Sequence, residues 1–187
     1  MLACGRDAIV QVPAARWDVS EGMAGLPERM AGITARVRHM GFVAKPELAD
    51  NKAFAISSVE TTAMDPCQRL ILEHGYTALH ETGADRAALG GSLTGVFLGF
   101  AGAEFAEVLR GSPAGSSAYA ATGASLSIAS GRLSYTLGLH GPCVSYDTAC
   151  SSSLAASHAG LRALQLTECD ECGLVVGVTL AVSPGIS

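Results

Sequence analysis

Apolar and polar positions predict a series of alternating helices and strands from residue 65 onward. Asp65 and Pro66 mark a helix start, because an Asp side chain can cap exposed N–H groups and Pro is tolerated at the first helical position. Apolar residues then recur at spacings of three and four until Gly83, where the helix is expected to end. Residues 1–52 are rich in Pro, Gly and charge with weak periodicity, which predicts loops with short elements.

The middle of the chain predicts one strand and one helix. Residues 94–100 form a short apolar run between glycines, which is typical of a strand. Residues 120–137 are rich in small side chains and predict a helix that contains Gly131. We expect this helix to pack closely against a neighbour.

The last third predicts a strand, a helix and a second strand. Residues 143–148 and 174–182 are the strands, and residues 151–165 are the helix. The residues at helical spacing are Leu154, His158, Leu161 and Gln165. This order predicts a βαβ unit with parallel strands and therefore an α/β fold. Cys150 lies at the junction of the first strand and the helix.

The composition agrees with buried strands. Hydrophobic residues make up 49% of the chain and charged residues 16%, which suits an α/β sheet covered on both faces, or a piece of a larger assembly. The apolar run at residues 172–182 is about half of the ~20 residues that a membrane-spanning helix needs, so we expect a strand and no membrane span.

The net charge and the cysteine count limit the classes of partner and the cellular location that we expect. With a net charge of -5 and 12 scattered basic residues, a nucleic-acid partner is not expected, because phosphate contacts need clustered Lys and Arg. Residues 1–10 lack the features of a secretory signal. Six Cys without the dense spacing of a disulfide scaffold predict free thiols in a reducing compartment. A cytoplasmic location is expected, with an organellar one as the alternative.

Cys150 is the candidate nucleophile. A thiol at a helix N-terminus lies at the positive end of the helix dipole, which favours the thiolate. The flanking residues are small, and a tight strand-to-helix turn of small residues leaves room for a substrate, as in a nucleophile elbow. Placement alone leaves two interpretations open, a catalytic cysteine and an inert buried one.

Several segments resemble one family. Residues 147–154 read DTACSSSL, which resembles the active-site signature of ketosynthase (β-ketoacyl synthase) domains in type I polyketide synthases. Residues 64–70 resemble the family's MDPQQRL, with Cys67 in place of Gln, and residues 131–135 match its GRLSY. Further matches are Gly141-Pro142, Arg16-Trp17-Asp18, Gly41-Phe42, Glu168-Cys169-Asp170 and Val176-Gly177-Val178, where Val176 replaces a Gly.

The resemblance implies a thiolase-like fold with αβαβα layers, of which residues 1–187 would be the N-terminal half, a partial ketosynthase domain truncated at both ends. The implied reaction is a decarboxylative Claisen condensation in polyketide or fatty-acid biosynthesis. Cys150 would carry the acyl chain as a thioester, and its backbone N–H would form one arm of an oxyanion hole. Phosphopantetheine would arrive on an acyl carrier protein together with acyl and malonyl-type thioesters. The domain would need no cofactor or metal of its own and would be a homodimer when complete.

The family's two catalytic His residues and a Lys would lie beyond Ser187. The five His of this chain are poor substitutes. His158 follows Cys150 by eight residues, roughly 12 Å along a helix, which is too far for a hydrogen bond. We expect His158 inside the protein or at an interface. His39, His74, His80 and His140 are expected to be structural or surface residues.

The sequence leaves three alternative functions open. One is a fatty-acid-type condensing enzyme, which the long DTACSSSL and MDP segments disfavour. Another is a gatekeeper ketosynthase that binds acyl chains without elongating them. The third, a purely structural dimer partner, is disfavoured because such partners lack the Cys. The Cys169/Cys172 pair has no second ligand pair for zinc and no thioredoxin-like context, so we interpret it as a surface turn.

We predict that the 187-residue chain by itself does not condense, because decarboxylation would lack its His donors. Purified chain incubated with a malonyl thioester should release no CO₂ above the buffer blank. Sustained CO₂ release would contradict this interpretation.

Overall fold

The computed structural model describes residues 7–14, 16, 38–43, 45–101, 104–169 and 173–180. Trp17, Asp18, Asp170, Cys172 and residues 181–182 of the second predicted strand lie outside these ranges. The chain forms two compact units, residues 46–182 and a smaller one made of residues 1–45 and 183–187.

The smaller unit contains a two-stranded antiparallel ribbon. Strand β1 (Ile9–Gln11) pairs with β2 (His39–Gly41), and Ile9 lies opposite Gly41. Arg16 donates a hydrogen bond to the carbonyl of Val43 at 2.9 Å, and its guanidinium lies 6.0 Å from the centre of the Phe42 ring. The RWD and GF segments noted in the sequence therefore contact each other here. In the residues of this region that the structure describes, short elements among loops agree with the prediction from the sequence.

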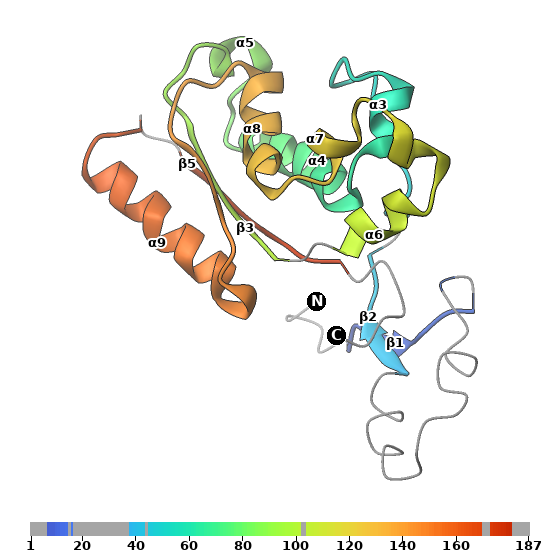
Figure 1. Cartoon of the computed structure of the whole chain (residues 1–187). Coiled ribbons are helices and arrows are strands. Elements are labelled where there is room, and N and C mark those ends of the chain that lie inside the picture. The colour runs from blue at the N-terminus through green and yellow to red at the C-terminus, as the bar shows by residue number, and fades with distance from the viewer. Residues whose placement is uncertain are drawn as a thin grey trace. The chain divides into compact units, whose positions relative to one another are not determined.

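The larger unit is built on a three-stranded parallel sheet (Figure 1). Its strands are β3 (Gly95–Phe100), β4 (Cys143–Tyr146) and β5 (Gly173–Val178). The order is β4-β3-β5, so the two strands of the predicted βαβ unit are parallel but lie on either side of β3. The α/β prediction is confirmed, and β3 takes the central position that a fully buried apolar strand favours.

Helices cover both faces of this sheet (Figure 1). They are α3 (Ser58–Ala63), α4 (Pro66–Glu81), α5 (Arg86–Leu89), α6 (Glu104–Arg110), α7 (Ala120–Gly123), α8 (Leu126–Leu137) and α9 (Ser152–Gln165), with short 3₁₀ turns at η3 (Pro113–Ser116) and η4 (Ala149–Ser151). Helix α9 lies against one face, and α4 and α8 lie on the other. The predicted start of α4 is confirmed, since Asp65 accepts a hydrogen bond from the Cys67 N–H at 2.7 Å.

Alternate residues of β3 point to two separate cores, as the pleat of a strand requires. Val96, Leu98 and Phe100 join the larger cluster, which includes Ile71 of α4 and Leu133 of α8. Phe97 packs on the opposite face with Ala156 and Ala163 of α9. The sheet therefore separates a large core from a thin one.

The thin core is made by the small residues of α9, and the predicted apolar stripe faces the other way. The residues buried against the sheet are Ser152, Ala156, Gly160 and Ala163. Leu154 is 73% exposed and Leu161 54% exposed, and both His158 and Gln165 are exposed. Of the two positions expected for His158, the interior one is therefore wrong, and the interface one stays a prediction. Small side chains let the helix backbone approach the sheet closely, which turns the larger ones outward.

The predicted helix at residues 120–137 is two helices with a break at Ala124 and Ser125. Gln68 of α4 accounts for the break, because its amide donates to the carbonyls of Thr122 and Ser125 at 3.3 and 3.1 Å. A continuous helix would use those carbonyls internally. Gly131 has open space where a side chain would point. The close packing expected of this segment occurs instead at Gly123, where a Cβ would lie 1.9 Å from the Ala63 carbonyl oxygen.

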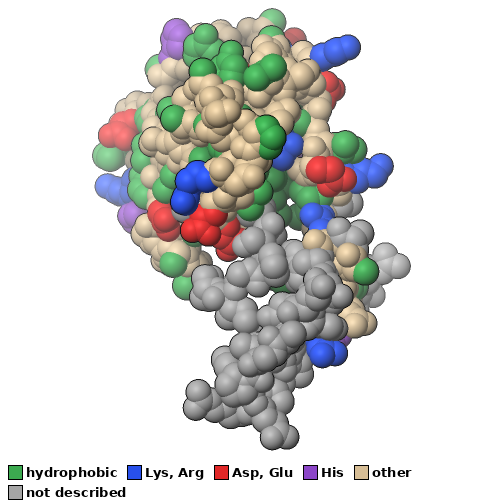
Figure 2. All heavy atoms as spheres, turned by 45° about the vertical axis from the view of Figure 1, so that its right-hand side comes forward, with side chains coloured by type: hydrophobic (Ala, Val, Ile, Leu, Met, Phe, Trp, Pro, Cys, Tyr) green, Lys and Arg blue, Asp and Glu red, His purple; other side chains and the backbone are tan. Residues whose placement is uncertain are grey.

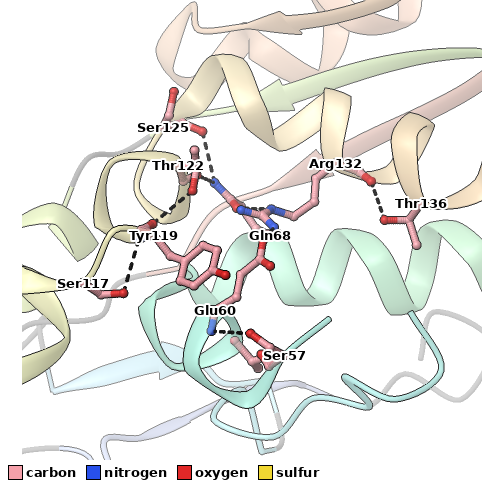
Figure 3. A network of polar contacts seen from close by, with 10 residues as sticks. Ser57, Glu60, Gln68, Ser117, Tyr119, Thr122, Ser125, Arg132 and Thr136 are labelled. Carbon is pink, nitrogen blue, oxygen red and sulfur yellow. Dashed lines mark hydrogen bonds and ion pairs between the residues drawn. The ribbon is translucent and has the colours of Figure 1, made fainter. Parts of the chain in front are cut away.

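Gln68 belongs to a buried polar network that joins three helices (Figure 3). Arg132 of α8 donates from Nε to Gln68 Oε1 at 2.8 Å and from Nη1 to Glu60 of α3. The Arg132 side chain is only 8% exposed and that of Glu60 24%. The MDPCQRL and GRLSY segments thus meet through Gln68 and Arg132, and their contact joins the helices on one face of the sheet.

Strand β5 is shorter and less buried than the predicted strand at residues 174–182. It ends at Val178, and only Leu174 among its residues is fully buried. Val176 packs against the larger core, on the face opposite α9. A Val in place of a Gly therefore adds apolar contact there without obstructing α9.

On the face shown in Figure 2, the Lys and Arg side chains of the larger unit's described residues stand apart among acidic and uncharged ones. Within the described part of the chain, no helix is both long enough and apolar enough to cross a bilayer.

We predict that Arg132→Ala destabilises the protein by about 2–3 kcal/mol, because it leaves the Glu60 carboxylate and the Gln68 amide without their buried partner. Urea denaturation followed by circular dichroism measures the change. Arg110→Ala is the matched control, since its contact to Glu107 is exposed and 3.9 Å long. That variant should stay within about 0.5 kcal/mol of the unaltered protein. Equal losses in both variants would contradict the network's role.

Candidate active site

Cys150 lies at the carboxyl edge of the parallel sheet, where β4 leads into α9. The chain leaves β4 after Tyr146, turns through η4 and enters α9 at Ser152. The Cys150 side chain is exposed and borders a cavity of about 370 Å³. The cavity is lined by Gly99, Ala101, Ala149, Cys150, Ser152, Ser153, Gly177, Val178 and Thr179. The Cys150 thiol is therefore not buried, and small residues leave room beside it.

A strained backbone positions this thiol. Ala149 has φ 52°, in the left-handed region that costs a residue with a Cβ roughly 1–2 kcal/mol. The Asp147 carboxylate accepts a hydrogen bond from the Ala149 N–H at 3.2 Å. The tight turn between a parallel strand and a helix that the sequence predicted is present, and its strain falls on the residue before Cys150.

Serine hydroxyls hold the turn. Ser152 is buried, and its hydroxyl accepts from the Thr148 N–H at 2.9 Å and donates to the Ala149 carbonyl at 2.7 Å. The Ser151 hydroxyl lies 2.7 Å from the Thr148 carbonyl, to which it donates. The run of serines after Cys150 therefore satisfies backbone groups that the sharp turn leaves outside regular structure.

Two glycines seat the first turn of α9 on the sheet. Gly99 of β3 and Gly177 of β5 are register partners on the strand face toward α9. A Cβ on Gly99 would lie 2.6 Å from the backbone of Ser152 and Ser153, and one on Gly177 would lie 2.2 Å from the Ser153 hydroxyl. Any other residue at Gly99 would push the helix start, and Cys150 with it, away from the sheet. Neither role was predicted from the sequence, although a glycine inside an apolar strand signals a close backbone approach.

The other described cysteines lie in different surroundings. Burial raises the pKa of the Cys67 thiol far above its usual range, and the neighbouring Asp65 carboxylate raises it further. The Cys67 thiol is therefore protonated, and its side chain packs in the core. The core thus accommodates a Cys at the position where the family's segment has Gln.

Cys169 is also buried, near Gly95 and Phe97, so the interpretation of it as a surface turn residue is wrong. Cys143 is exposed on β4. Cys67, Cys143 and Cys150 are free thiols, as expected.

Among the described lining residues of the cavity beside Cys150 there is no His. His74, His80, His140 and His158 are exposed on other parts of the larger unit, and none lines the cavity beside Cys150. Among the described residues there is also no cluster of three or more His, Cys, Asp or Glu side chains that could hold a metal ion.

The profile of the family described as "Beta-ketoacyl synthase, N-terminal domain" matches residues 1–187. The chain belongs to the β-ketoacyl synthase family. It is 44% identical over 186 residues to the spectinabilin polyketide synthase system protein NorC of Streptomyces orinoci, covering 99% of this chain and 8% of that protein. It is 43% identical over 185 residues to the pikromycin polyketide synthase component PikAII of Streptomyces venezuelae, covering 98% of this chain and 5% of that protein.

Solved ketosynthase structures share the fold. The ketosynthase from module 6 of the bacillaene synthase of Bacillus subtilis 168 matches with a TM-score of 0.80 and 33% identity, covering 98% of this chain and 28% of that one. The oxazolomycin ketosynthase domain OzmH KS7 of Streptomyces albus JA3453 matches with a TM-score of 0.78 and 32% identity, covering 96% and 31%. These matches confirm the resemblance to polyketide ketosynthases. They also confirm the thiolase-like fold that was expected for this N-terminal domain. The chain spans less than a third of these solved ketosynthases.

We predict that Gly99→Ala destabilises this β-ketoacyl synthase domain by about 2–3 kcal/mol, because the new methyl group meets backbone that cannot move without shifting α9. Gly131→Ala is the matched control. Its methyl group points into open space within α8, and replacing a helical Gly should stabilise by about 0.5–1 kcal/mol. Thermal or urea unfolding compares the two. Similar changes in the free energy of unfolding in both variants would contradict the close packing of α9 against the sheet.

Proposed function

We propose that Cys150 is the nucleophile that accepts an acyl chain from the phosphopantetheine thioester of an acyl carrier protein, and that the complete domain extends this chain by decarboxylative Claisen condensation. The observation that carries the proposal is the exposed Cys150 thiol on a strained strand-to-helix turn, beside a cavity lined by small residues. Membership of the β-ketoacyl synthase family supports the reaction class.

In the first half-reaction the Cys150 thiolate attacks the carbonyl carbon of the acyl thioester. A new S–C bond forms, and negative charge collects on the carbonyl oxygen, where the Cys150 N–H acts as a hydrogen-bond donor. The bond to the carrier sulfur then breaks. The proton that leaves the cysteine ends on the carrier thiol, so the step consumes no other reagent.

In the second half-reaction a malonyl-type thioester on another carrier protein loses CO₂. The electron pair of the broken C–C bond attacks the carbonyl of the Cys150 thioester, and a new C–C bond forms as the S–C bond to Cys150 breaks. The product is a β-ketoacyl chain on the carrier protein, and the cysteine is regenerated. Groups that assist decarboxylation would come from the part of the domain beyond Ser187.

The domain uses phosphopantetheine only as the arm of its carrier protein and needs no cofactor of its own. The outward apolar face of α9, with Leu154 and Leu161, supports the proposal that this chain is the N-terminal part of a layered domain whose remainder covers that face. A homodimer of the complete domain and a cytoplasmic location complete the proposal.

The proposal is tested by acyl loading. The protein is incubated with an acyl N-acetylcysteamine thioester, and mass spectrometry locates the added acyl group. We expect it on the peptide that contains Cys150, and Cys150→Ser should lower loading at least a hundredfold, because a neutral hydroxyl is a far weaker nucleophile than a thiolate.

Cys143→Ser is the matched control, since Cys143 is an exposed thiol on β4 outside the cavity. It should load at the rate of the unaltered protein. Loading that survives Cys150→Ser, or that is lost in Cys143→Ser, would overturn the assignment of the nucleophile.

A further inference from the structure

The hydroxyl of Ser152 connects the two ends of the strained turn. It accepts from the Thr148 N–H at 2.9 Å and donates to the Ala149 carbonyl at 2.7 Å, so it bridges the backbone on both sides of the left-handed Ala149. The backbone N–H of Ser152 also donates to the Ala149 carbonyl. Ser152 is 4% exposed, so water competes little for these bonds.

The Ala149 carbonyl and the Cys150 N–H belong to one peptide group. Because a peptide group is planar, a bond that fixes the carbonyl also fixes the direction of the N–H at its other end. That N–H is the donor that would stabilise the oxyanion formed when a thioester is attacked. The catalytic value of such a donor depends on its being aimed before the reaction begins.

We propose that Ser152 is a positioning residue, whose hydroxyl holds the Ala149–Cys150 peptide so that the Cys150 N–H points at the carbonyl oxygen of a bound thioester. The proposal rests on the function proposed for Cys150 and deepens it. Ser152 lies at the edge of the cavity, but its hydroxyl is engaged by backbone groups of the turn. It acts through the orientation of the peptide group.

The contacts distinguish this role from ordinary helix capping. Ser152 is the first residue of α9, but its hydroxyl reaches back into the turn and bonds no group within the helix beyond it. Ser157, inside the same helix, shows instead the back-bonding common for helical serines. Its exposed hydroxyl donates to the carbonyl of Ser153 one turn earlier, at 2.8 Å.

Two reactions of the Cys150 thiol distinguish a positioning role of Ser152 from a purely structural one. Acyl transfer from an acyl N-acetylcysteamine thioester passes through an oxyanion, whereas alkylation by iodoacetamide does not. Both rates are measured at Cys150 by mass spectrometry of its peptide. In Ser152→Ala, we expect acyl transfer to fall about tenfold to a hundredfold, while alkylation changes by less than about threefold.

Ser157→Ala is the control and should change neither rate by more than about twofold, since its hydroxyl bonds no group of the turn. Ser152→Thr keeps a hydroxyl and should recover most of the acyl transfer. If Ser152→Ala does not fold, the same two rates are compared in Ala149→Gly with and without Ser152→Ala, because Gly adopts the left-handed conformation without strain.

A parallel fall of both rates, or no fall in either, would overturn the positioning role. Failure of the unaltered protein to load acyl groups on Cys150, with normal alkylation, would instead overturn the proposed function. The two failures are therefore distinguishable.

Discussion

The close approach of helix α9 to the sheet is the constraint on which the site depends. Gly99 and Gly177 lie side by side on β3 and β5, and the first turn of α9 occupies the space that their side chains would need. With the helix start fixed there, the chain that leaves β4 has only a short turn in which to reverse. Ala149 adopts the left-handed conformation in that turn, and Cys150 is presented at the sheet edge as a consequence. Within the described residues, backbone packing and the hydrogen bonds of the turn therefore define the geometry of the thiol.

Some of the family's sequence segments stabilise the fold, and another surrounds the candidate nucleophile Cys150. Gln68 and Arg132 come from two different segments and meet in a buried network with Glu60, away from the cavity beside the thiol. This network joins the helices of one face, and that face supplies the large core behind β3. The segment around Cys150 occupies the opposite face, where the core is thin and side chains are small. The large core can thus hold the sheet rigid while the thin one leaves room for a substrate.

The sequence was sufficient for features set by neighbouring residues and insufficient for those set by distant ones. The Asp65 cap and the position of Cys150 depend on local chemistry, and both predictions agree with the structure. The break before α8 could not be predicted, because it is held by Gln68 from more than fifty residues away. The buried face of α9 was not predicted either. Helical spacing marks an apolar stripe at Leu154, but it does not show that small residues on the other side permit a closer contact with the sheet.

A crystal structure of the protein after treatment with an acyl thioester would test the central claim most directly. The account predicts an acyl group on the Cys150 sulfur, inside the cavity beside it, with its carbonyl oxygen about 2.7–3.1 Å from the Cys150 backbone nitrogen. Ala149 should keep its left-handed conformation in that structure. An acyl group on another residue, or a carbonyl oxygen turned away from the Cys150 N–H, would contradict the account.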